Sequence, residues 1–276
     1  MSDFICCCII ESDGDPGNDQ RMNNLASLTT AIVRTSDKHN LQDGIILLPA
    51  GYINSGNQEA RSIIPDVETK IKNLLLDINH NLIMCVGIDG LKKEDGYAGD
   101  QLVLAISKSG TMAIARKFWP VANEKDKIRA AADYLSNEGE YSRKLALNQN
   151  IFYLAVCYDV FGIKRGEKGA YNNPGVNGIL ACIHGFSPKG QGGSGVSLFV
   201  RHGIAGASRQ WNCPVYTSAT YLNRKISQNW PSAVLWNQGD KSTKNWHYTD
   251  NPMRVFTKET ITLPYEKIRF DIYTLG

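Results

Sequence analysis

The stretch that decides the fold reads IFYLAVCYDVFG, from Ile151 to Gly162. A short apolar run rich in β-branched and aromatic residues, ended by polar and small residues, indicates a buried strand. Cys157 stands where this strand gives way to a turn, a place where a rigid strand could position a nucleophilic sulfur. A cysteine that ends a buried strand is more often a plain core residue, because free cysteine is among the most buried residue types. Both readings of Cys157 stay open on this segment alone.

Strand and helix signals alternate on both sides of this stretch. Apolar runs at 4–10 and 44–48 flank a helical pattern at 19–35, a βαβ opening that implies parallel strands. A hairpin is expected from 101–106 and 111–118, around Ser109-Gly110. We therefore predict an α/β fold with central sheets covered by helices. The other expected elements are helices at 67–79, at 125–135 and within 195–207, and strands at 82–88, 178–183, 214–219, 233–236 and 261–265.

Composition limits the classes of function. The chain has 276 residues with no long polar linker, so we expect a single domain over 1–276. A net charge of +3 without a dense basic block does not favour nucleic acid. The N-terminal apolar run at 4–10 is too short for a membrane span and lacks the basic start of a signal peptide.

The cysteines indicate a compartment rather than a metal site. There are seven, an odd number, and none forms a CxxC pair. This pattern favours free thiols in a reducing compartment, so we expect a cytoplasmic protein without a metal site or disulfides.

Three motifs occur in a telling order along the chain. LLPAGY (Leu47–Tyr52) ends the second strand, ARKFWP (Ala115–Pro120) ends the hairpin, and CYDVF (Cys157–Phe161) ends the central strand. Together they resemble the nitrilase superfamily of carbon–nitrogen hydrolases, over roughly residues 4–220. The resemblance implies a four-layer α–β–β–α sandwich, with the residues from about 250 to 276 as a C-terminal extension. It also implies a homodimer or larger homo-oligomer, in which the segment 253–275 would cross to a neighbour.

The same resemblance implies roles for individual residues. Cys157 would be the nucleophile, and Lys117 the cation that favours its thiolate and binds the oxyanion. Glu124 corresponds to a second glutamate that orients the lysine and the substrate, and Tyr158 and His184 are candidates for substrate binding. The alternatives are a surface lysine at 117, a solvated charge at 124 and a structural histidine at 184. The stretch 182–195, which is long and rich in glycine, would form a substrate-binding loop.

Position 50 departs from the family pattern, because Ala50 stands where the catalytic glutamate is expected. Alanine cannot carry a proton. Either the general base comes from elsewhere, or the chain does not hydrolyse C–N bonds, or the base was deliberately removed. If the chain is a disabled hydrolase, replacing Ala50 by Glu should raise amide turnover.

Two functions follow from these observations. The first is a cysteine hydrolase that cleaves a non-peptide C–N bond of a small amide, carbamoyl compound or nitrile through a thioester on Cys157, without a cofactor. The second is a non-catalytic relative that binds a small molecule or a partner. An acyltransferase is a third reading that nothing in the sequence selects.

Overall fold

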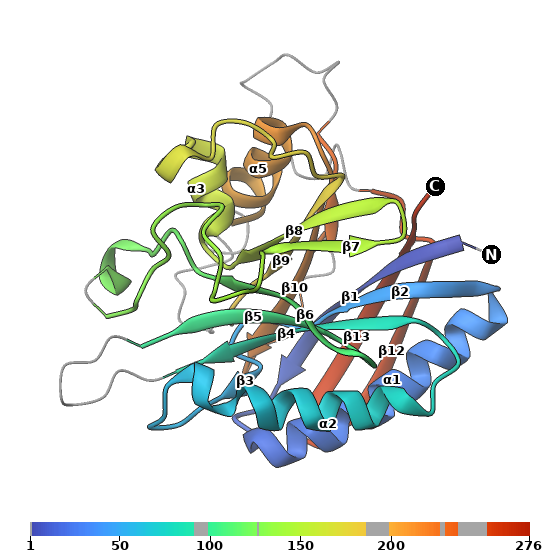
Figure 1. Cartoon of the computed structure of the whole chain (residues 1–276). Coiled ribbons are helices and arrows are strands. Elements are labelled where there is room, and N and C mark those ends of the chain that lie inside the picture. The colour runs from blue at the N-terminus through green and yellow to red at the C-terminus, as the bar shows by residue number, and fades with distance from the viewer. Residues whose placement is uncertain (1, 91–98, 126, 186–198, 227–229, 237–252) are drawn as a thin grey trace.

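A computed structural model of the chain describes residues 2–90, 99–125, 127–185, 199–226, 230–236 and 253–276. Strands and helices alternate along these ranges, as the sequence predicts (Figure 1). The helices are α1 (Gly17–Lys38), α2 (Ile64–Leu76), α3 (Asp159–Arg165) and α5 (Ala205–Trp211), with short 3-10 turns η1 (Ala60–Ile63), η2 (Ala122–Glu124) and η3 (Glu167–Gly169) and a π-helical stretch η4 (Phe199–Ile204). The strands are β1 (Ser2–Ser12), β2 (Leu41–Leu47), β3 (Ile53–Asn54), β4 (Leu82–Asp89), β5 (Gln101–Ser107), β6 (Gly110–Arg116), β7 (Lys144–Leu147), β8 (Asn150–Val156), β9 (Gly178–Cys182), β10 (Val215–Leu222), β11 (Ala233–Val234), β12 (Thr257–Leu263) and β13 (Glu266–Thr274).

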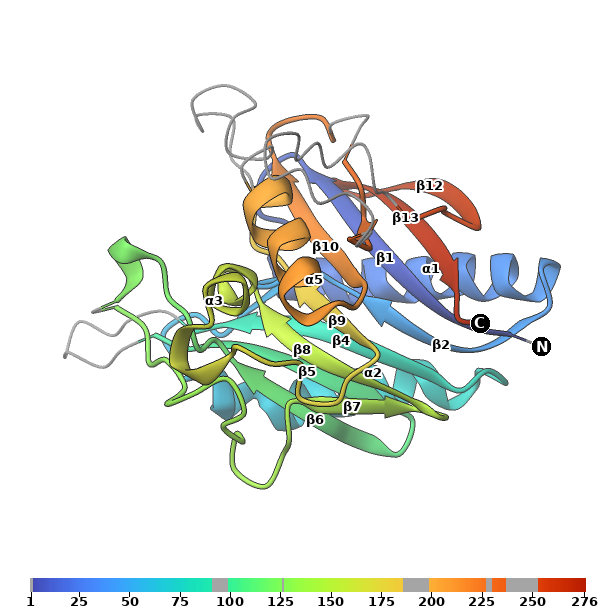
Figure 2. The same cartoon turned by 90° about the horizontal axis from the view of Figure 1, so that it is seen from above.

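The main strands follow the order β6-β5-β4-β2-β1-β10-β9-β8-β7. Strand β1 joins the two halves of this order, because Phe4–Cys7 pair with β2 and Ile9–Ser12 pair with β10. The halves lie over one another, with α1 and α2 outside one half and α3 and α5 outside the other (Figures 1 and 2). The architecture is therefore the predicted α–β–β–α sandwich.

Alternating side chains along each strand build the layers, since successive residues of a strand face opposite sides. On β2, Ile46 faces the helices and packs in the same buried cluster as Leu28 of α1 and Ile71 of α2. Its neighbours Ile45 and Leu47 face the opposite sheet and share a cluster with residues of β8 and β9. A third cluster joins β8–β10 to α3 and α5.

The strand directions bring chemistry-bearing positions to one edge. Strands β1, β2 and β4 are parallel, as are β1, β10, β9 and β8. Strand β6 also runs parallel to β4, because both are antiparallel to β5. The carboxyl ends of β2, β4, β6, β8 and β9 therefore lie at the same edge, where α/β proteins commonly bind ligands.

One prediction about secondary structure is wrong. Residues 125 and 127–135 do not form the expected helix, because backbone N–H groups in this segment bond to neighbouring segments: Arg129 donates to Gly99 at 2.8 Å and Ala131 to Lys117 at 2.9 Å. Within the segment 253–275, β12 pairs with β13 and β13 pairs along β1 of the same chain, and the crossing to a neighbour stays a prediction. The helix expected within 195–207 is confirmed from residue 199 onward, and 195–198 lie outside the described residues.

Within the described ranges, no helix is both long and apolar enough to cross a membrane.

Candidate active site

Cys157 lies on a sharp turn between β8 and α3. Its φ of 49° is in the left-handed region, which residues other than glycine rarely adopt and which often marks functional positions. Its backbone N–H donates to the carbonyl of Cys182 at 2.8 Å, which fixes the turn against the end of β9. The residue is 8% exposed, whereas the cysteines of β1, β4 and β9 are fully buried. This strand-to-helix turn resembles the elbow that presents a nucleophile in α/β hydrolases.

A buried aspartate ties this elbow to the lysine loop. One carboxylate oxygen of Asp159 accepts the N–H groups of Phe118 and Trp119, at 2.8 and 2.9 Å. The other accepts the N–H of Val156 at 3.0 Å. Asp159 therefore holds the backbone just before Cys157 through Val156, and its bonds to residues 118 and 119 fix the loop that carries Lys117.

Lys117 is fully buried, so the surface reading of this residue is wrong. Its Nζ donates to Glu124 Oε2 at 2.6 Å and to Gln101 Oε1 at 2.8 Å. Glu124 is itself held by the N–H of Val121 at 3.0 Å and is only 22% exposed, so it is not a solvated charge. Gln101 was not anticipated from the sequence.

Lys117 and Glu124 form a charged pair. Burial works against the lysine charge, but the negative groups of Cys157 and Glu124 raise the pKa of Lys117. Burial also works against the carboxylate, but the hydrogen bond and charge of Lys117 lower the pKa of Glu124. Lys117 therefore acts as a fixed cation at neutral pH.

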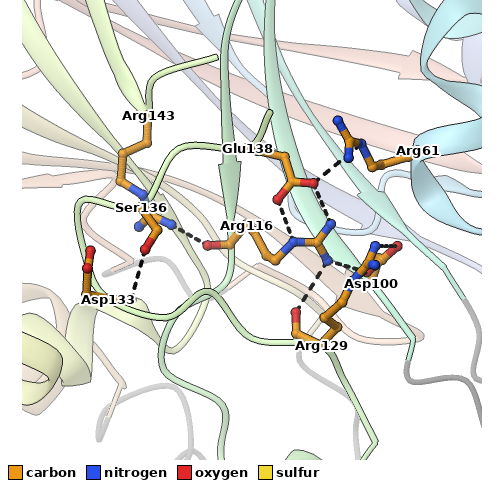
Figure 3. Close-up of polar contacts among 8 residues, drawn as sticks. All are labelled: Arg61, Asp100, Arg116, Arg129, Asp133, Ser136, Glu138 and Arg143. Carbon is orange, nitrogen blue, oxygen red and sulfur yellow. Dashed lines mark hydrogen bonds and ion pairs between the residues drawn. The ribbon is translucent and has the colours of Figure 1, made fainter. Parts of the chain in front are cut away.

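A network of ion pairs and hydrogen bonds surrounds Arg116, the residue before Lys117 (Figure 3). Arg116 forms a bidentate ion pair with Glu138, in which Nε donates to Oε2 at 2.6 Å and Nη2 donates to Oε1 at 2.7 Å. It forms a second ion pair with Asp100. Arg143 donates to the carbonyl of Arg116 and, at 2.6 Å, to the hydroxyl of Tyr153 on β8. These contacts fix the backbone just before Lys117, and they leave its side chain free to face Glu124.

The chain around position 50 is closely packed. Ala50 is 4% exposed, and its N–H donates to the carbonyl of Ile183 at 3.2 Å. The next residue, Gly51, has a φ of 64°; a Cβ there would lie 2.7 Å from Asp89 Oδ2 and 3.1 Å from His184 Cδ2. An imidazole and a carboxylate thus occupy the space beside the position where the family resemblance places a glutamate.

His184 lies between Asp89 and Cys157. Its Nε2 is 2.9 Å from each carboxylate oxygen of Asp89, which ends β4. His184 also lies close enough to Cys157 for its ring and its backbone to act on the thiol, and they lower its pKa. The imidazole thus lies between a carboxylate and the sulfur.

The charges in this chain favour an ion pair. Burial opposes the thiolate, but the positive charges of His184 and Lys117 outweigh it and lower the pKa of Cys157. Burial favours a neutral imidazole, yet the negative charges of Asp89 and Cys157 raise the pKa of His184 to about 10. The two positive charges therefore favour the thiolate form of Cys157.

The remaining candidates are less informative. The ring of Tyr158 stacks on Phe161, with centroids 4.4 Å apart, and contacts Phe199 edge-on. This packing leaves its role in substrate binding a prediction. Most of the glycine-rich stretch, residues 186–195, lies outside the described residues.

No protein-family model and no curated protein matches the sequence. Solved structures do match. A cysteine-to-serine mutant of the Nesterenkonia AN1 amidase, from the nitrilase superfamily, is 12% identical over 78% of this chain and 77% of that chain, with a TM-score of 0.52. A glutamate-to-glutamine mutant of the amidase from Nesterenkonia sp. AN1 is 13% identical over 78% of each chain, with a TM-score of 0.51. A glutamine-dependent NAD(+) synthetase from Cytophaga hutchinsonii is 10% identical over 82% of this chain but only 38% of that chain, with a TM-score of 0.51.

These likenesses show that the chain has the fold of the nitrilase-superfamily amidases. The glutamate-to-glutamine mutant carries acrylamide added at what is described as its active site cysteine. At such low identity the comparison concerns the fold, and the chemistry of this chain has to be argued from its own residues.

Proposed function

We propose that the chain is a cysteine hydrolase that cleaves a non-peptide C–N bond of a small amide, carbamoyl compound or nitrile. The observation that carries the proposal is the placement of Cys157. It stands on a strained elbow beside the buried Lys117, and the surrounding positive charges lower its pKa. A purely structural cysteine needs neither the strained backbone nor the cations.

The reaction follows from these groups. The Cys157 thiolate attacks the carbonyl carbon, and Lys117 stabilises the oxyanion that forms. A donor of this kind typically contributes about 2.7–4 kcal/mol to the transition state. Collapse of the tetrahedral intermediate breaks the C–N bond. The leaving nitrogen takes one proton from a donor in the site and departs as the neutral amine, and a thioester remains on Cys157. Water then hydrolyses the thioester to a carboxylic acid.

Glu124 positions the lysine in this scheme. Its carboxylate accepts from Nζ at 2.6 Å while Gln101 accepts from the same ammonium group. With two of its three N–H groups directed this way, Lys117 has one left for the sulfur or the oxyanion. We also propose that the protein works as a homo-oligomer in the cytoplasm, as the resemblance and the free cysteines suggest.

Ala50 favours one competing function, a pocket that binds a small molecule without turning it over. Incubation with short aliphatic amides, carbamoyl compounds and nitriles distinguishes the two functions. We expect ammonia release that the Cys157→Ser variant lacks, together with an acyl adduct on Cys157 found by peptide mass spectrometry. A parent chain that acquires no adduct on Cys157, even from the activated ester p-nitrophenyl acetate, would contradict the hydrolase.

A further inference from the structure

We propose that His184, oriented by Asp89, is the acid–base group that moves protons at Cys157, in the role that a glutamate at position 50 would otherwise fill. This inference rests on the proposed function and adds the catalytic group that the sequence lacks. It changes the expected role of His184 from substrate binding to proton transfer.

The geometry supplies the first reason. Asp89, Cys157 and His184 follow the carboxyl ends of β4, β8 and β9, which meet at one edge of the sandwich. Asp89 engages Nε2 at 2.9 Å, so Nδ1 is the ring nitrogen left for the sulfur. A carboxylate on one imidazole nitrogen fixes the orientation of the ring and stabilises its protonated form.

The second reason is what lies next to position 50. Gly51 has no side chain, and a Cβ there would overlap the carboxylate of Asp89. The loop that follows β2 therefore passes directly against the Asp89–His184 pair. The Asp89–His184 pair thus lies next to the position where the family resemblance places the glutamate.

The other charged groups near the sulfur cannot take this role. Lys117 is held protonated by the negative groups around it, so it serves as a cation. Glu124 accepts from Lys117 and from the N–H of Val121, and its pKa is lowered. Among the described residues that face Cys157, His184 is therefore the group that can act both as a proton donor and as a proton acceptor.

His184 donates the proton needed in the first step and accepts the proton released in the second. In the first step the S–C bond forms, the C–N bond breaks, and the imidazolium of His184 gives its proton to the leaving nitrogen. In the second step the neutral imidazole takes a proton from water as the water oxygen bonds to the thioester carbon. The S–C bond then breaks, and the acid leaves beside a regenerated thiolate and imidazolium.

Acetylation by p-nitrophenyl acetate separates these steps, because nitrophenolate leaves without needing a proton. We expect the His184→Gln variant to acquire an acetyl group on Cys157, which Lys117 still activates. Hydrolysis of that acetyl group should slow by about 10²–10⁴-fold, the usual contribution of a general base. Asp89→Asn, which keeps the imidazole, should slow hydrolysis by less.

His80→Gln is a matched control. His80 Nε2 lies 2.8 Å from Asp37 Oδ1, so the chain has a second His–Asp pair, next to the opposite end of β4. This variant should hydrolyse the acetyl group at the parental rate. A measurement on the parent needs no variant: hydrolysis should slow as pH falls through the pKa of His184, which the thiolate no longer raises once Cys157 is acetylated.

The outcomes separate the two proposals. If the parent and His184→Gln hydrolyse acetyl-Cys157 at the same rate, or the parental rate does not change with falling pH, His184 is not the base and the hydrolase still stands. If the parent is never acetylated at Cys157, the hydrolase itself falls.

Discussion

Replacing Asp159 by Ala should destabilise the fold severely, because one buried carboxylate satisfies three backbone N–H groups. They belong to Phe118, Trp119 and Val156, and the carboxylate is fully buried. A buried donor left without a partner costs about 1–3 kcal/mol, so three cost about 3–9 kcal/mol. This is a large part of the roughly 5–15 kcal/mol that stabilises a typical domain. The guanidinium of Arg143, 3.8 Å away, also loses a neighbouring negative charge.

Urea unfolding followed by circular dichroism measures this loss. We expect Asp159→Ala to lose at least about 3 kcal/mol and Asp159→Asn to lose less, because its amide oxygen can still accept from two of the three donors. Asp133→Ala is the control, since Asp133 is exposed and accepts only in its own turn, from Leu135 at 2.7 Å. It should cost under about 1 kcal/mol. An Asp159→Ala variant as stable as Asp133→Ala would refute the view that this carboxylate joins the cysteine elbow to the lysine loop.

Four further predictions concern the sulfur and its neighbours. Lys117→Ala should raise the pKa of Cys157 and slow its alkylation by iodoacetamide at neutral pH, and an unchanged rate would show that the lysine charge does not reach the sulfur. Gly51→Ala should lower the rate of acetyl-Cys157 hydrolysis. The added Cβ would lie 2.7 Å from the Asp89 carboxylate, and the φ of 64° at this position disfavours alanine. Hydrolysis at the parental rate would mean that the Asp89–His184 pair is not held against this loop. Alkylation should stay fast to a lower pH than for an ordinary thiol, whose pKa is about 8.5, because the nearby cations lower the pKa of Cys157. His184→Gln should shift this limb of the pH profile to higher pH. The raised pKa of His184 stabilises the folded state fully below its ordinary value of about 6.5, and that contribution should fade as pH rises towards about 10, which thermal unfolding across pH measures.

The sequence predicted the elements that local patterns determine. The apolar run before Cys157 forms β8, the hairpin turns next to Ser109-Gly110, and the amphipathic pattern after residue 19 forms α1. Each depends on periodicity or turn chemistry within a few residues. The segment 125–135 has helix-forming composition, but its N–H groups find long-range partners that no local pattern reveals.

The residues of the site also divide into those that the sequence predicted and those that it did not. Cys157, Lys117 and Glu124 were found through motifs, and the structure brings all three together. Asp89 and Gln101 were missed because each stands alone at the end of a strand. Asp89 left one usable signal: it follows a predicted parallel strand, and the carboxyl ends of parallel strands meet at one edge. At position 50 the sequence showed only that the expected glutamate is absent. It could not show that His184 lies beside this position, because the two residues are distant in sequence.

The most direct test of an activated Cys157 compares its alkylation with that of Cys213 in the folded parent chain. The two residues are almost equally buried, at 8% and 4% exposed, so burial alone predicts similar labelling. Their charges differ, because cations lower the pKa of Cys157 while burial raises the pKa of Cys213 to about 12. With limiting iodoacetamide at neutral pH and peptide mass spectrometry, we expect nearly all of the label on Cys157. Equal, slow labelling of both cysteines would mean that Cys157 is a buried structural thiol and would contradict the hydrolase.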